Sequence, residues 1–392
     1  MNDSRTVLTD TEQRIWLEAF HLEGEEPDEP WSIDKWTIRG GPGDGIDVID
    51  IDNGCLSVSV LPTRGMGLWK ARCDDLSLGW DSPVRRPVHP SLVRTADAGG
   101  IGWLGGFNEL LARCGLASHG APGVDHVSDA KGATTEVPVT LHGRIANLPA
   151  HKVEVGTDGD GRLWVRGEID ETMLFGPCLH LASTFATHPG SNRISLHDRI
   201  TNLSGREAEF EVLYHTNIGR PLLGPGARLV APARRVIPRN QHAADDIRQF
   251  DVFASPDVDY VEQCYFLELQ SDDADRTLVV LHDAGGQRGL ALEYAIHPLP
   301  CFTLWKNTMA DADGYVAGIE PSTDYPNPRE FERANGRVPT LAPGASWDAH
   351  IDFVALTTPE EVNESVARVK SLLGETSTRL VEMPLPHLCP AD

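Results

Sequence analysis

Residues 193–219 read RISLHDRITNLSGREAEFEVLYHTNIG and carry the pattern that decides the fold. Apolar side chains alternate with polar ones on both sides of the turn-forming segment NLSGR: Ile194, Leu196, Ile200, Phe210, Val212 and Tyr214. An alternation with a period of two is typical of a β-strand that buries one face. The stretch therefore predicts two antiparallel strands joined as a hairpin.

The same alternation recurs along much of the chain. Asn53 and Gly54 predict a hairpin turn before the alternating residues 56–60. Further strands are predicted at 163–169 and 301–306, and a second hairpin at 278–296 around the turn AGGQRG. The 37 glycines and 28 prolines favour many turns and short strands. Because no strands alternate with long helices, the chain is predicted to be all-β, an antiparallel sandwich or barrel.

The N-terminal segment differs from this pattern. Thr9 and Asp10 precede apolar residues within 15–20 whose spacing suits a short amphipathic helix, and the acidic stretch EGEEPDEP follows at 23–30. We expect residues 1–45 to form an extension to the main domain.

The C-terminal segment carries the clearest helix signal. Thr358 is a plausible N-cap, Pro359 suits the first helical position, and Gly374 would end the helix. We expect one β-sandwich domain over 46–374 that ends in this helix, and a tail at 375–392.

Composition excludes several classes of protein. The 392 residues include 34 Lys and Arg against 58 Asp and Glu, a net charge of −24, which repels nucleic acids and anionic lipid surfaces. We expect neither as a partner. The first residues are polar and acidic and unlike a signal peptide. The seven cysteines lack a C-x-x-C spacing, which indicates reduced thiols and a cytoplasmic location.

The familiar catalytic motifs are absent or broken. GGPGDG at 40–45 has a proline inside a potential dinucleotide fingerprint, and no P-loop, H-E-x-x-H or G-x-S-x-G segment is present. Three titratable residues lie instead at the ends of predicted strands: His142, His215 and Glu320. A histidine can donate a proton while a carboxylate accepts one, which is the chemistry that opens and closes a hemiacetal.

These segments resemble the galactose mutarotase-like superfamily, and most closely its aldose 1-epimerase-like DUF4432 branch. The likeness extends from about residue 46 to 355 and rests on LHGRIANLPA at 141–150, NLSGREAEFEVLYHTNIG at 202–219 and GIEPSTDYPNP at 318–328. It implies a large antiparallel supersandwich, a carbohydrate ligand and no organic cofactor. The chain departs from the typical motifs at Thr216 and Ser322, so the sugar is left open.

The resemblance also implies roles for individual residues. Glu320 would be the general base and His215 the general acid in aldose 1-epimerisation, while His142 would hold a sugar hydroxyl or share the acid role. Further substrate-binding residues are predicted around them: Arg64, Arg113, Arg144, Asn217, Trp305 and Lys306.

Other interpretations of these residues remain open. Arg64 could pair with an acid in a turn, Arg113 could cap a helix, and Trp103 and Trp305 could be core or wall residues. No short-range ligand spacing supports a metal at His142 and His215 with Glu262 or Glu320, and we expect none. The protein could be a mutarotase, a non-catalytic carbohydrate-binding or regulatory protein, or a sugar isomerase or lyase, as a monomer or homodimer.

Overall fold

The computed structural model describes residues 3–24, 30–128 and 132–390. Most of the acidic stretch expected at 23–30 lies outside these residues. Within the described ranges, no helix is long and apolar enough to cross a membrane.

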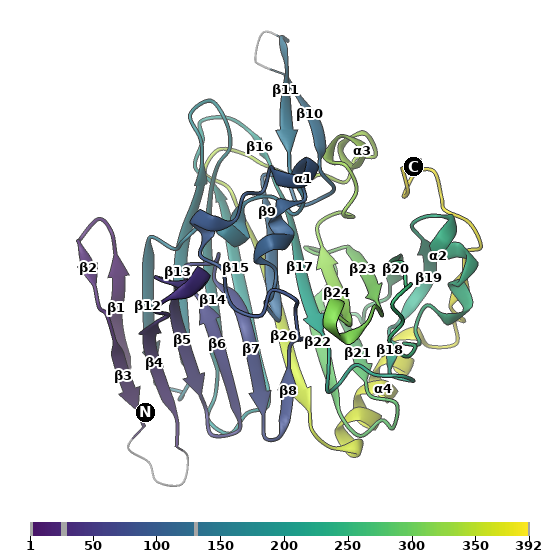
Figure 1. The fold of residues 1–392 in the computed structure, drawn as a ribbon, viewed down its shortest axis with the longest axis horizontal. Helices are drawn as coiled ribbons and strands as arrows, with labels where there is room; N and C mark the ends of the chain where they lie inside the picture. Colours follow the sequence, from purple (N-terminus) through teal and green to yellow (C-terminus); the bar gives the residue numbers. More distant parts are fainter. Residues whose placement is uncertain (1–2, 25–29, 129–131, 391–392) are drawn as a thin grey trace.

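Two large sheets lie face to face and form the body of the molecule (Figure 1). The ten-stranded sheet contains, in spatial order, β18 (Arg228–Val230), β21 (Arg276–His282), β22 (Gly289–Ala295), β26 (Ser346–Leu356), β15 (Arg193–Asn202), β14 (Cys178–Thr187), β13 (Leu163–Thr172), β12 (Lys152–Thr157), β1 (Ser4–Asp10) and β2 (Ile15–Trp16). The thirteen-stranded sheet contains β27 (Arg379–Leu380), β19 (Ala233–Pro238), β20 (Gln263–Leu269), β23 (Cys301–Asn307), β24 (Val316–Ser322), β17 (Glu211–Ile218), β9 (Leu111–Leu116), β7 (Gly67–Cys73), β6 (Leu56–Leu61), β5 (Asp47–Asp52), β4 (Ser32–Thr37) and β3 (Phe20–Glu23), with β8 (Leu76–Leu78) paired to β7. The predicted antiparallel β-sandwich is confirmed.

Short helices, turns and two-stranded ribbons connect and flank the strands of the two sheets. Two small ribbons pair β10 (Gly123–Ser128) with β11 (Thr134–Val139), and β16 (Ala208–Glu209) with β25 (Thr340–Leu341). The α-helices are α1 (Asp97–Gly100), α2 (Gln241–Asp245), α3 (Arg329–Ala334) and α4 (Pro359–Leu373). The 3-10 turns are η1 (Gly41–Gly43), η2 (Pro90–Leu92), η3 (Gly102–Gly106), η4 (Ile145–Asn147), η5 (Ile247–Gln249) and η6 (Asp311–Asp313).

The hairpin predicted within residues 193–219 is wrong, although both of its strands exist. β15 pairs with β14 and β26 in the ten-stranded sheet, whereas β17 pairs with β9 and β24 in the other sheet. The segment between them crosses from one sheet to the other, and the Asn202 side chain donates to the carbonyl oxygens of Arg206 and Leu341 there. Alternation indicates which face of a strand is buried, but it does not identify the neighbouring strand.

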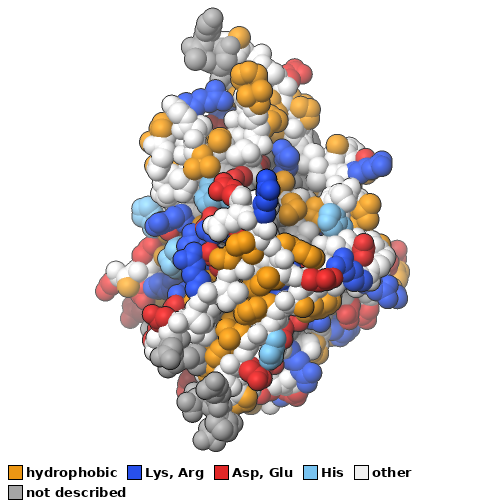
Figure 2. All heavy atoms as spheres, turned by 90° about the vertical axis from the view of Figure 1, so that its left-hand side faces the viewer, with side chains coloured by type: hydrophobic (Ala, Val, Ile, Leu, Met, Phe, Trp, Pro, Cys, Tyr) orange, Lys and Arg blue, Asp and Glu red, His pale blue; other side chains and the backbone are white. Residues whose placement is uncertain are grey.

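The predicted N-terminal helix is also wrong. Residues 4–23 form β1, β2 and β3, and β1 pairs with β12 while β3 pairs with β4. An isolated helix of a few turns is marginal, whereas strands gain hydrogen bonds from sheets that already exist. This edge exposes Trp16 and Trp36, and Figure 2 shows apolar side chains interspersed with charged ones on this side. The boundary at residue 46 stays a prediction, since residues on both sides of it share sheets.

The C-terminal helix and the two remaining hairpins are confirmed. Thr358 and Glu361 form a capping box at the start of α4, and Gly374 follows its last turn. β5 pairs with β6, and β21 pairs with β22, as the turn residues predicted. The segment after α4 returns to the sheet, where β27 runs parallel to β19.

Candidate active site

Two adjacent strands of the thirteen-stranded sheet hold His215 and Glu320 against each other. The register that pairs Thr216 of β17 with Ile319 of β24 sets His215 opposite Glu320. His215 Nε2 lies 3.2 Å from Glu320 Oε1, and the two side chains are 5% and 3% exposed. Gly318 makes room for this contact, because a Cβ there would overlap Glu320 Oε1 and lie 3.1 Å from His215 Cε1.

His142 reaches the same place from the turn between β11 and β12. Its ring centroid is 5.2 Å from that of His215, with the two rings nearly perpendicular. Its Nδ1 lies 3.1 Å from the carbonyl oxygen of His119. A carbonyl oxygen only accepts, so Nδ1 carries the proton and neutral His142 keeps a lone pair on Nε2. The structure thus brings His142, His215 and Glu320 together from three distant segments.

Aromatic side chains surround the two histidines. The ring centroids of Phe107 and Trp305 lie 5.0 and 5.4 Å from that of His215, and the Trp103 centroid lies 4.6 Å from that of His142. Phe107, Trp305 and Trp103 thus form an aromatic wall around the site, where His142, His215 and Glu320 are each at most 9% exposed. Apolar faces next to polar groups suit the alternating C–H and hydroxyl surfaces of a sugar.

Two buried polar atoms around the pair, Trp103 Nε1 and Thr303 Oγ1, have no hydrogen bond to any described residue, and Glu320 Oε1 has only its 3.2 Å approach to His215 Nε2. Register places Thr303 of β23 directly beside Glu320. Buried polar groups without partners are costly unless a ligand or water satisfies them. Together they offer donors and acceptors to a hydroxylated ligand. Thr303 was not among the residues predicted from the sequence. The only signal for it there is its position two residues before Trp305, which places both side chains on the same face of the strand.

Asn217 fixes the tautomer of His215. The Asn217 amide nitrogen lies 3.0 Å from the carbonyl oxygens of both Glu109 and His215, so it is the donor in both contacts. Its Oδ1 therefore accepts from His215 Nδ1, 2.7 Å away. With the Nδ1 proton held there, neutral His215 presents the lone pair of Nε2 to Glu320.

Burial opposes charge on His142, His215 and Glu320. It places the pKa of His215 well below its ordinary value, and a neighbouring charge on His142 would lower it further. Burial, with the nearby charge of Glu262, raises the pKa of Glu320 well above its ordinary value. Burial lowers the pKa of His142 to about 4. The favoured resting state is a neutral His215–Glu320 pair that holds a single proton on Glu320.

Two of the predicted pocket cations lie in the interior between the sheets. Arg113 pairs in register with Tyr214, on the face of β17 opposite to that of His215, and forms a buried ion pair with Asp198. Lys306 donates to the carbonyl oxygens of Gln249 and Val252 at 2.8 and 2.9 Å. Neither joins the three site residues.

The other predicted substrate-binding residues have three different surroundings. Arg64 is buried, forms an ion pair with Glu109 at 2.6 Å and donates to the Gly106 carbonyl oxygen, so it supports the segment that carries Phe107. Arg144 is exposed. Trp305 belongs to the aromatic wall and donates to Glu262 at 2.5 Å.

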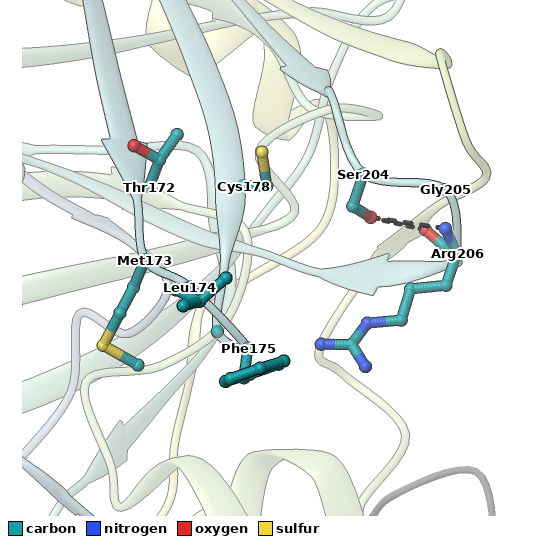
Figure 3. Close-up of a pocket in the computed structure, with 9 residues that line it drawn as sticks. Thr172, Met173, Leu174, Phe175, Cys178, Ser204, Gly205 and Arg206 are labelled. Carbon is teal, nitrogen blue, oxygen red and sulfur yellow. Dashed lines mark hydrogen bonds between the residues drawn. The ribbon is translucent and has the colours of Figure 1, made fainter.

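A hollow of the surface lies elsewhere, at the tip of the β13–β14 hairpin (Figure 3). It measures about 700 Å³ and is lined by residues 172–176, Cys178 and 204–206. Leu174 and Phe175 are 81% and 91% exposed there. No predicted site residue lines it.

The sandwich of two large antiparallel sheets matches the galactose mutarotase-like fold. The profile of the family named "Domain of unknown function (DUF4432)" matches residues 43–355, and the chain belongs to that family. A crystal structure of a candidate aldose 1-epimerase from Klebsiella pneumoniae is 31% identical, with a TM-score of 0.92 over 98% of this chain and 99% of that one.

More distant structures show the same fold. A galactose mutarotase-like protein from Clostridium acetobutylicum is 15% identical with a TM-score of 0.56, covering 87% of this chain and 99% of its own. Galactose 1-epimerase from Lactobacillus acidophilus is 14% identical with a TM-score of 0.54, covering 86% of this chain and 98% of its own. No curated protein sequence matches the chain.

Proposed function

We propose that the protein is an aldose 1-epimerase-like enzyme that interconverts the anomers of a free or modified sugar at the His215–Glu320 pair. The observation that carries the proposal is the 3.2 Å approach of His215 Nε2 to Glu320 Oε1 in a buried site. A catalytic acid and base must lie within reach of the same substrate atoms, and this pair meets that condition. The name of the similar Klebsiella pneumoniae protein supports the same reaction class.

The proposed reaction conserves the single proton of the pair. Transfer of the Glu320 proton to His215 Nε2 yields a carboxylate and an imidazolium. The carboxylate takes the proton of the C1 hydroxyl as the bond between C1 and the ring oxygen breaks, and Nε2 gives its proton to the ring oxygen. The aldehyde rotates about C1–C2, and ring closure reverses both transfers.

His142 has a positioning role in this proposal. With its pKa lowered to about 4 it is neutral at pH 7, which disfavours a share in the acid step. Its Nε2 lone pair is free to accept a hydrogen bond from a sugar hydroxyl. Asn217 holds His215 in the tautomer that exposes Nε2 to Glu320.

The test is the rate of anomer exchange in a panel of aldoses and sugar acids, followed by polarimetry and NMR in deuterated water. We expect acceleration of at least one sugar with no deuterium at carbon, because ring opening exchanges only hydroxyl protons. Deuterium at carbon would instead identify an isomerase or lyase. Saturable sugar binding without acceleration would identify a carbohydrate-binding protein, which the aromatic wall also suits.

The pH profile of the same reaction provides a second test. Below the lowered pKa of His215 the pair binds a second proton, and above the raised pKa of Glu320 it holds none. We therefore expect kcat/KM to stay level between these two shifted pKa values, with the acid limb well below pH 6.5 and the basic limb well above pH 4.5. A pH profile whose limbs lie near 4.5 and 6.5, the ordinary pKa values of glutamate and histidine, would contradict the neutral resting pair.

Location and assembly belong to the same proposal. All seven cysteines are free thiols, which suits a reducing compartment such as the cytoplasm. We propose a monomer or homodimer whose partner is a small carbohydrate.

A further inference from the structure

Two histidines and an aspartate meet on the solvent side of the ten-stranded sheet. Asp170 lies on β13, His180 on β14, and His151 directly before β12. His180 Nδ1 is 2.7 Å from Asp170 Oδ1, and His151 Nε2 is 3.4 Å from Asp170 Oδ2. One potential ligand atom from each residue lies within 4.8 Å of the other two. The catalytic pair is on the other sheet, so this cluster is independent of the proposed function.

The sheet fixes the positions of all three residues. Asp170 and His180 are direct cross-strand partners, so their side chains project from the same face. The backbone N–H of His151 donates to Glu168, and its carbonyl oxygen accepts from Thr11. Ligands on paired strands are held in place more firmly than ligands on loops.

His151 supplies the observation that points to a missing ligand. Its Nε2 is buried and makes no hydrogen bond within the described parts of the chain. The carboxylate of Asp170 lies between the two imidazoles, and each ring presents a nitrogen to it. The hydrogen bond between His180 and Asp170 satisfies the His180 ring but leaves His151 Nε2 without a partner. A cation held between the three side chains would give a partner to both rings.

We propose that His151, Asp170 and His180 bind a divalent transition-metal ion such as Zn²⁺. Imidazole nitrogen and carboxylate oxygen are ligands that Zn²⁺ prefers. Zn–N bonds of about 2.0–2.1 Å place two tetrahedral ligand atoms roughly 3.4 Å apart. The His151–Asp170 distance already matches this value, whereas the 2.7 Å between His180 and Asp170 must lengthen when the ion replaces their hydrogen bond. With three protein ligands, the remaining coordination position belongs to water or to a small ligand.

The site is accessible from solvent. The three side chains are between 21% and 39% exposed. The next cross-strand pair on the same face, Thr172 and Cys178, lines the hollow shown in Figure 3. The protein's strong negative charge also raises the local concentration of cations.

The test is calorimetric titration of the full, metal-free chain with Zn²⁺, repeated with Co²⁺ to record the visible spectrum. We expect one ion per chain, and affinity at least about tenfold weaker in His151→Ala, His180→Ala and Asp170→Asn, in line with the loss of a ligand. His188→Ala is the matched control, since His188 is an exposed histidine near Asp160 and outside the cluster. Its affinity should equal that of the unsubstituted protein.

A competing metal site must be separated in the same experiment. Cys55, Cys73 and Asp74 form another group of potential ligands. Binding that persists in Cys55→Ser, without a thiolate–cobalt charge-transfer band, supports the proposed site. Absence of saturable binding, full affinity in the His151→Ala/His180→Ala double variant, or loss of binding in Cys55→Ser would each overturn it. Because the three residues are at the surface, circular dichroism should show every variant folded.

Discussion

Substituting Glu320 by glutamine is expected to lower kcat/KM for anomer exchange by about 10²–10⁴-fold, the contribution of a positioned acid or base. Glutamine preserves the shape of the side chain and can still hydrogen-bond a sugar, but it can neither hold nor release the proton that the His215–Glu320 pair requires. Sugar affinity should therefore change little. The measurement combines polarimetric rates with a binding titration of the same sugar on the folded variant.

Glu262→Gln is the matched control for this variant. It makes the same chemical change at a carboxylate that accepts from Trp305, at the edge of the site, without touching His215. We expect a much smaller loss of rate. Unchanged exchange in Glu320→Gln, or an equal loss in both variants, would show that Glu320 does not transfer the proton.

The second large effect concerns stability. Arg113→Met is expected to lower the free energy of unfolding by about 3–5 kcal/mol, because it leaves the carboxylate of Asp198 buried without its cation. Arg113 and Asp198 are both almost fully inaccessible, and the Tyr214 hydroxyl and the Ser183 hydroxyl belong to the same network. Urea denaturation provides the measurement.

Arg144→Met tests the same substitution at an exposed arginine. Its free energy of unfolding should stay within about 0.5 kcal/mol of the unsubstituted value. If Arg113→Met kept normal stability and instead weakened sugar binding, Arg113 would be the pocket cation predicted from its motif. The buried network around Asp198 would then contribute little to the free energy of unfolding.

Much of the fold could be predicted because alternation directly reports burial on one face of a strand. The hairpins at β5–β6 and β21–β22 add turn residues that define the partner as well. The crossover after β15 has no such signal, since NLSGR suits either a hairpin or a passage between sheets. At the N-terminus, the apolar spacing suited a helix, yet available sheet edges made strands more favourable.

Only part of the site could be predicted from the sequence, because β17 is buried along its whole length and so shows no alternation of buried and exposed side chains. On such a strand, parity separates Tyr214 from His215 but does not reveal which of the two faces the site. Arg113 pairs with Tyr214 and therefore faces the interior between the sheets, not the site, and Lys306 lies on the opposite face of its strand from Trp305. Asn217 lies two residues after His215, so both side chains project from the same face of β17. This spacing could have indicated that Asn217 orients His215.

A crystal structure of the protein with a bound aldose would show directly whether the His215–Glu320 pair contacts the sugar. We expect the C1 hydroxyl and the ring oxygen to lie within hydrogen-bonding distance of Glu320 and His215 Nε2, with the aromatic wall against the sugar ring. A sugar bound with full occupancy in the hollow beside Phe175, with none at the His215–Glu320 pair, would contradict this expectation.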